Sequence, residues 1–134
     1  MTSYSQEVSV LGAVIVAAVA VFFAGMGFFA LAAPGRLLAP FDITLGSATA
    51  RSEVRAVYGG FGLAMAAVLV TALAEPDLRA GVLLTVAAAL AGMALGRVAS
   101  LLDARTAFYP NWFYLVVEVG ASAALMLAYA DPTG

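Results

Sequence analysis

The fold is decided by an uncharged run at residues 8–33, which has the sequence VSVLGAVIVAAVAVFFAGMGFFALAA. A helix that crosses the roughly 30 Å hydrocarbon core of a bilayer needs about 20 apolar residues, because each residue advances the helix by about 1.5 Å. The run is long enough, and Pro34-Gly35-Arg36 ends it. It is too long for the apolar part of a signal peptide, and Met1–Glu7 carry no positive charge, so we expect an uncleaved membrane span.

Three further runs meet the same requirement, at about residues 54–74, 80–102 and 112–130. They are bounded by turn and stop signals at Glu75-Pro76-Asp77, at residues 103–111 and at Asp131-Pro132. We therefore predict an all-α fold, an integral membrane four-helix bundle that forms a single domain over residues 1–134.

The longest connection, residues 34–53, is expected to lie at the membrane interface. Its segment Arg36–Ile43 is too apolar for a freely solvated loop. Either the connection acts as a lid over the end of the bundle, or it is an interfacial connector without a gating role.

The composition excludes several classes of function. Hydrophobic residues make up 64% of the chain and charged residues 10%, and the mean hydropathy is +1.04, which is typical of a membrane protein. Six Arg, no Lys and a net charge of −2 offer no basic face for nucleic acid. Without Cys or His there is no disulfide, no thiolate nucleophile, no Cys/His zinc site and no Ser-His-Asp triad. We expect no metal site, because two inward carboxylates facing two arginines make a poor cation cage.

The distribution of arginines predicts the orientation of the spans. Arg36, Arg51 and Arg105 lie in the connections on one side, and Arg55 and Arg97 lie near that end of their helices. The positive-inside rule places this side in the cytoplasm. Both termini should then face outward.

Small residues predict where the helices pack. Apolar burial gives helices no net drive to associate within lipid, so close packing has to hold them together. Ala88, Gly92, Gly96 and Ser100 recur every four residues in the third span, and Gly59 belongs to a glycine-rich part of the second. We expect these two spans to pack as a glycine-faced hairpin.

Ionisable residues within the spans are the candidate ligand-binding residues, because a charge in the membrane is costly without a partner. Arg55 and Tyr58 lie three residues apart on the second span, Arg97 lies on the third and Glu118 on the fourth. Arg97 and Glu118 should each lie about 9 Å inside the same interface, which permits an ion pair.

A supporting polar network is expected around these four residues. It comprises Glu53, which pairs with Arg51 or Arg105, together with Ser100, Asp103 and Tyr114. Two interpretations stay open. The network either fixes which helix faces which, or lines a cavity in which Arg55, Tyr58, Arg97 and Glu118 hold a polar head while apolar side chains receive a tail.

The segment Glu53-Val54-Arg55-Ala56-Val57-Tyr58-Gly59-Gly60, followed by Gly96-Arg97, Asp103 and Glu118, resembles a bacterial four-helix membrane family catalogued as domain of unknown function 4345. Ala104 stands where that family usually has Gly after the Asp. The family is similar to the DoxX-like membrane proteins, several of which are associated with quinones, redox partners or membrane-protein assembly. The resemblance implies a bundle in a bacterial inner membrane and assigns no catalytic residue.

Three functions compete at this point. The first is binding of a small amphipathic ligand, a quinone or a lipid headgroup, in a polar pocket near the cytoplasmic face. The second is a non-catalytic accessory subunit that associates with another membrane protein or with copies of itself. The third is a proton-coupled transporter that uses Glu118. Neither a cofactor nor a reaction is assigned by the sequence.

Overall fold

The computed structural model describes the backbone of residues 2–131 and the side chains of residues 9–131. Every regular element in that range is a helix, which confirms the predicted all-α class. The predicted stop signal at Pro132 lies outside the described residues. In chain order the elements are α1 (Thr2–Ala32), α2 (Pro34–Leu38), η1 (Ala39–Phe41), α3 (Ala48–Val54), η2 (Arg55–Gly60), α4 (Phe61–Ala74), α5 (Pro76–Ala99), η3 (Ser100–Leu102), η4 (Phe108–Trp112) and α6 (Phe113–Tyr129).

Within the described residues, four helical stretches are long and apolar enough to cross a membrane, namely Ser9–Ala32, Ala48–Ala74, Pro76–Leu102 and Phe108–Tyr129. The second, third and fourth begin earlier than the expected starts near residues 54, 80 and 112. The Ser47 side chain accepts a hydrogen bond from the backbone N–H of Ala50 at 3.0 Å, which caps the second stretch at its true start. Pro76 starts the third, because proline suits the first helical turn.

The expected interfacial loop at residues 34–53 is therefore largely helical. It begins with α2 and η1, crosses back through the non-helical residues 42–47, and ends within α3. Asp42 adopts a left-handed backbone conformation with φ 58°, which turns the chain after η1. We call residues 34–47 the strap.

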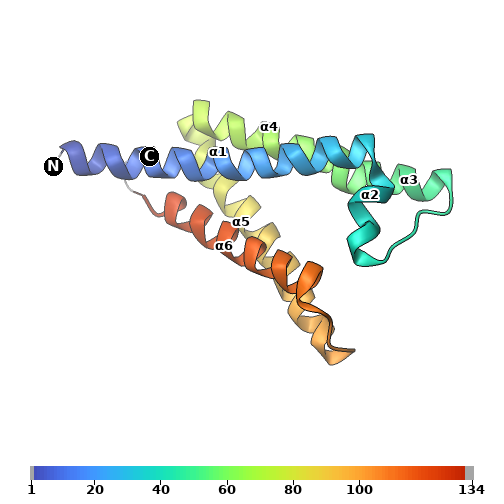
Figure 1. Cartoon of the computed structure of the whole chain (residues 1–134). Helices are drawn as coiled ribbons and strands as arrows, with labels where there is room; N and C mark the ends of the chain where they lie inside the picture. The colour runs from blue at the N-terminus through green and yellow to red at the C-terminus, as the bar shows by residue number, and fades with distance from the viewer. Residues whose placement is uncertain (1, 132–134) are drawn as a thin grey trace.

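The long helices form two antiparallel pairs (Figure 1). One pair is α1 with the continuous stretch α3–η2–α4, and the other is α5 with α6. The pairs meet at the end that holds the α4–α5 turn and diverge toward the strap, so the four-helix bundle is splayed at one end. Buried side chains from all four helices form its core, among them Val16, Phe23, Leu69, Leu83, Val86, Leu90 and Leu125.

The glycine packing differs from the expected hairpin between the second and third spans. A Cβ on Gly27 of α1 would lie 2.9 Å from the carbonyl oxygen of Gly59, and one on Gly59 would lie 2.8 Å from Leu31 Cδ2. The glycines of the second span therefore pack against the first span. Gly92 and Gly96 would meet nothing within 4 Å, so the predicted ridge on the third span faces outward. The spacing of small residues identified the smooth helix face, but it did not show which neighbouring helix packs against it.

Candidate functional site

The predicted ion pair between Arg97 and Glu118 is confirmed. Arg97 Nε on α5 donates to both carboxylate oxygens of Glu118 on α6, at 3.0 Å to Oε1 and 2.8 Å to Oε2. The Glu118 side chain is only 4% exposed, and 20% of the Arg97 side chain remains exposed. The carboxylate is thus enclosed, while part of the guanidinium stays accessible.

One stripe of α6 faces α5. Tyr114, Glu118 and Ser122 recur every four residues and therefore lie on the same helix face. Tyr114 and Glu118 contact Arg97, and the Ser122 hydroxyl donates to the carbonyl oxygen of Ala87 at 2.8 Å. This polar stripe fixes the rotation of α6 against α5.

Asn111 and Phe41 complete the surroundings of Arg97. Arg97 Nη1 donates to Asn111 Oδ1 at 3.4 Å, a long contact. The guanidinium carbon lies 5.9 Å from the ring centre of Phe41 and 5.6 Å from that of Tyr114, which is cation–π distance. The two rings are themselves 5.5 Å apart. We call Phe41, Arg97, Asn111, Tyr114 and Glu118 the Arg97 cluster.

Sequence analysis gave no role to Asn111 or Phe41. A signal for Asn111 was present, because it precedes Glu118 by seven residues and so shares its face of a regular helix. Phe41 had no such signal, since it comes from a remote segment. It reaches the cluster because η1 packs against η4.

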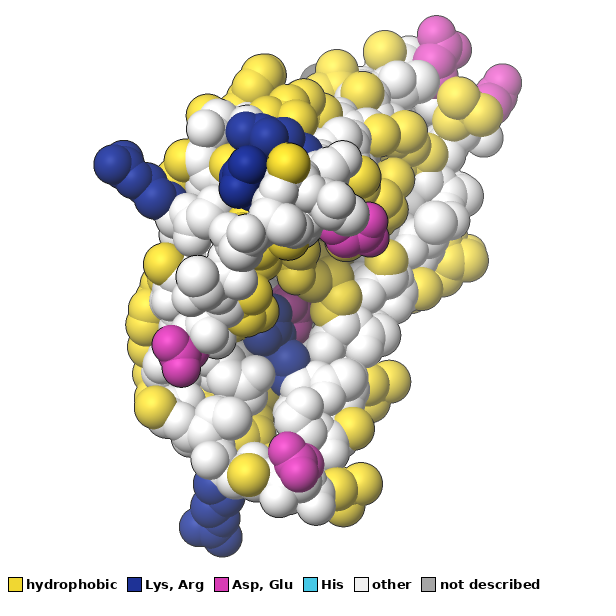
Figure 2. Space-filling view, turned by 90° about the vertical axis from the view of Figure 1, so that its right-hand side faces the viewer, with side chains coloured by type: hydrophobic (Ala, Val, Ile, Leu, Met, Phe, Trp, Pro, Cys, Tyr) yellow, Lys and Arg dark blue, Asp and Glu magenta, His cyan; other side chains and the backbone are white. Residues whose placement is uncertain are grey.

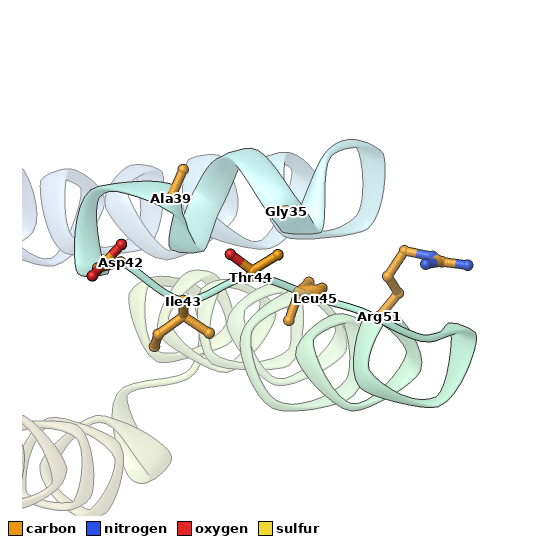
Figure 3. A pocket seen from close by; sticks show the side chains of 7 residues that line it. All are labelled: Gly35, Ala39, Asp42, Ile43, Thr44, Leu45 and Arg51. Carbon is orange, nitrogen blue, oxygen red and sulfur yellow. The ribbon is translucent and has the colours of Figure 1, made fainter.

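The strap thus links the two helix pairs at their divergent end. Its other side holds a cavity of about 320 Å³ between α2 and the non-helical chain (Figure 3). The cavity is lined by Gly35, Ala39, Asp42, Ile43, Thr44, Leu45 and Arg51, and the Arg51 side chain points away from the others. The Arg97 cluster lies outside this cavity, because none of its residues lines it.

The divergent end is hollowed. Figure 2 views the molecule from that end and shows basic and acidic side chains together inside the hollow, with hydrophobic side chains around them. Arg97 and Glu118 are an ion pair from the helices that border this end. A molecule entering the hollow would meet polar groups at its inner wall and apolar groups on its sides.

The other predicted ligand-binding residues lie elsewhere. Arg55 Nε donates to the carbonyl oxygen of Leu31 at 3.0 Å, one residue before α1 ends. It therefore satisfies a carbonyl of the last helical turn and places a positive charge at the negative end of the helix dipole. Tyr58 is half-buried on η2, and its side chain makes no hydrogen bond or ring contact with any described residue.

The predicted supporting network does not assemble, apart from Tyr114. The Ser100 hydroxyl donates to the carbonyl oxygen of Gly96 in its own chain segment at 3.1 Å. Glu53 and Asp103 are exposed, and neither forms an ion pair with a described residue. Exposed carboxylates at a helix end are solvated well enough to need no partner, which explains why sequence proximity to Arg51 and Arg105 was misleading.

The cluster is equipped for binding. Both oxygens of Glu118 are engaged by Arg97, so the carboxylate is held rather than presented as a base. A guanidinium has five N–H donors, and in this cluster Nε uses one and Nη1 makes one long contact. Donors therefore remain for a bound molecule.

Comparison with known proteins gives one match. A family model described as "Domain of unknown function (DUF4345)" matches residues 12–129. Neither the curated proteins nor the solved structures that were compared with the chain gave a match.

Proposed function

The chain belongs to the DUF4345 family, and from that premise we propose that it binds a small amphipathic molecule, a quinone or a lipid, at the divergent end of its bundle. The polar end of the molecule contacts Arg97 and Asn111, and its tail lies between the two helix pairs. The observation that carries the proposal is the enclosed Arg97–Glu118 ion pair on the helices that border the divergent end, where Figure 2 shows a hollow with hydrophobic side chains around it.

The cost of the ion pair supports this role. Buried ion pairs are often no more stabilising than apolar residues of similar volume, because both charges lose their hydration. Packing of α5 against α6 already includes Leu83, Leu90 and Leu125 in a shared core. Apolar side chains therefore already hold α5 against α6. The ion pair adds a partly accessible guanidinium, which can bind a polar group and which an apolar pair would lack.

Native mass spectrometry from a mild detergent tests the proposal. The wild type should retain a bound lipid or quinone. The double variant Arg97→Gln/Glu118→Gln should lose it, because it removes both charges together and leaves no buried charge unpaired. Arg105→Gln is the matched control, since Arg105 is exposed and outside the cluster. Equal retention by all three proteins, or no retention by the wild type, would refute the proposed site.

We further propose that the divergent end faces the cytoplasm in a bacterial inner membrane, which follows from the positive-inside rule. The chain has no Cys, so single cysteines can map its sides directly. In intact cells a membrane-impermeant maleimide should label Glu75→Cys at the α4–α5 turn and leave Gly46→Cys in the strap unlabelled. The reverse pattern would invert the orientation.

A second candidate function has its own observation. Ala88, Gly92 and Gly96 form an outward-facing ridge of small residues on α5, and such ridges suit close helix packing in membranes. This favours an accessory subunit that packs against a partner helix. Gly92→Leu should then lose a companion that co-purifies with the wild type from native membranes, and a lone monomer in both cases would count against this role. The transport alternative gains no support, since Arg97 holds both oxygens of Glu118.

A further inference from the structure

Resting on the proposed function, we infer that the Arg97 cluster selects an uncharged headgroup with carbonyl acceptors and discriminates against anionic headgroups. The carbonyl source is either a quinone ring or the ester of a neutral lipid. The juxtaposition that carries the inference is the carboxylate of Glu118 held directly on Arg97 Nε.

The cluster has no net charge. Arg97 contributes one positive charge and Glu118 one negative charge, and their bonded atoms are 2.8 Å apart. Phe41, Asn111 and Tyr114 carry no formal charge. Asp103 and Arg105, the nearest charged residues along the chain after Arg97, are exposed and form no ion pair with a described residue. An anion that reaches Arg97 would therefore meet a positive charge that Glu118 already compensates.

Because Glu118 is buried, the lack of net charge at the cluster should decide which headgroups bind there. An anion that leaves water for a medium of low dielectric constant loses far more free energy of hydration than a carbonyl group does. At Arg97 the anion would also be repelled by Glu118, which is 4% exposed and therefore weakly screened. A carbonyl group avoids both costs.

Hydrogen-bonding capacity points the same way. Arg97 Nη1 and Nη2 carry N–H donors, and the Asn111 side-chain amide has N–H donors of its own because its oxygen faces Arg97. The carboxylate oxygens of Glu118 are already engaged. A ligand with acceptors thus finds partners, and the flat faces of Phe41 and Tyr114 suit a planar ring.

Trp112, the only tryptophan in the chain, reports on binding because it adjoins Asn111 in η4. The protein is kept in dodecyl maltoside, a detergent without charge or carbonyl groups, and its fluorescence is titrated with decylbenzoquinone, which quenches tryptophan. Monodecanoylglycerol and decyl phosphate then compete as neutral and anionic amphiphiles of similar tail length. We expect the quenching to saturate as decylbenzoquinone is added. Decyl phosphate should compete poorly with decylbenzoquinone for the site. If monodecanoylglycerol displaces decylbenzoquinone, a lipid ester is the preferred source of the carbonyl group. If it does not, a quinone ring is preferred.

Glu118→Gln provides the sharper test, because it keeps the shape of the side chain and removes its charge. Arg97 is then uncompensated, and the apparent affinity for decyl phosphate should rise by about tenfold or more. Glu75→Gln removes one exposed acidic charge at the opposite end and should leave that affinity unchanged.

The outcomes separate the two proposals. Tight decyl phosphate binding by the wild type, or no gain in Glu118→Gln, overturns the selectivity while amphiphile binding still stands. Absence of saturable binding by all three probes overturns the proposed function itself. Circular dichroism of Glu118→Gln confirms that the variant folds before its affinity is compared.

Discussion

Arg97 and Glu118, from the two helices of the second pair, form an ion pair in which a single N–H of Arg97 is shared between both oxygens of Glu118. This arrangement leaves the outer nitrogens of the guanidinium turned toward Asn111 and the rings of Phe41 and Tyr114. The same residue therefore fastens α5 to α6 and presents donors at the divergent end of the bundle.

The effects of substituting Arg97 and Glu118 on the free energy of unfolding should depend strongly on each other. Arg97→Leu or Glu118→Leu alone should lower the free energy of unfolding by about 3–5 kcal/mol, because each leaves the other charge unpaired. The double variant Arg97→Leu/Glu118→Leu should lie close to the wild type. Unfolding in mixed micelles, followed by circular dichroism during addition of SDS, measures all three. Additive losses in the double variant would mean that the two residues do not stabilise each other.

Two classes of glycine should respond differently to substitution. Gly27→Ala should lower the free energy of unfolding by about 1–3 kcal/mol, because the new Cβ would lie 2.9 Å from backbone atoms of Gly59 and Leu63. Gly96→Ala should be neutral or slightly stabilising in the isolated protein, since its Cβ would meet nothing within 4 Å. The same SDS titration compares them. Equal effects would contradict the packing of the second span on the first.

The sequence was sufficient to predict the helical class and the number of spans, because each apolar run is long enough to cross a bilayer by itself. It was insufficient to predict the pairing of helices. Gly59 and Gly92 both lie in runs with small residues at regular spacing, yet only Gly59 is buried. Which face is buried depends on the shape of a neighbouring helix, and spacing along one helix carries no information about that shape.

For the candidate site, the cost of a charge in the membrane was enough to predict the pairing of Arg97 with Glu118. By the same cost, Arg55 was predicted to bind a ligand together with this pair, but its partner is a carbonyl at the end of α1. A charge within a span needs a partner, but its position in the sequence does not show which partner is near. Phe41 could not be predicted as a site residue in this way, because an aromatic side chain in an apolar segment carries no charge and needs no partner.

Arg55 should matter for the end of α1. Arg55→Met removes the hydrogen bond to the Leu31 carbonyl and should cost about 1 kcal/mol of unfolding free energy. Hydrogen exchange of the amides of Ala33 and Leu37, which follow this helix end, should become faster. Arg51→Met is the matched control, because Arg51 is exposed and its side chain makes no hydrogen bond with a described residue. Unchanged exchange in Arg55→Met would mean that the carbonyl is served by water.

Phe41 should hold the strap against the second helix pair. Phe41→Ala removes the ring contact with Tyr114 at 5.5 Å and the cation–π contact with Arg97, each of which contributes about 1 kcal/mol. The strap should then open more often, so acrylamide should quench Trp112 more efficiently and retention of the amphipathic molecule should fall. Phe28→Ala is the control, since Phe28 is 64% exposed on α1. If the Phe41 variant retained the molecule as well as the wild type, with unchanged quenching of Trp112, the strap would be a passive connector, because closing the site would not depend on the ring that contacts Arg97 and Tyr114.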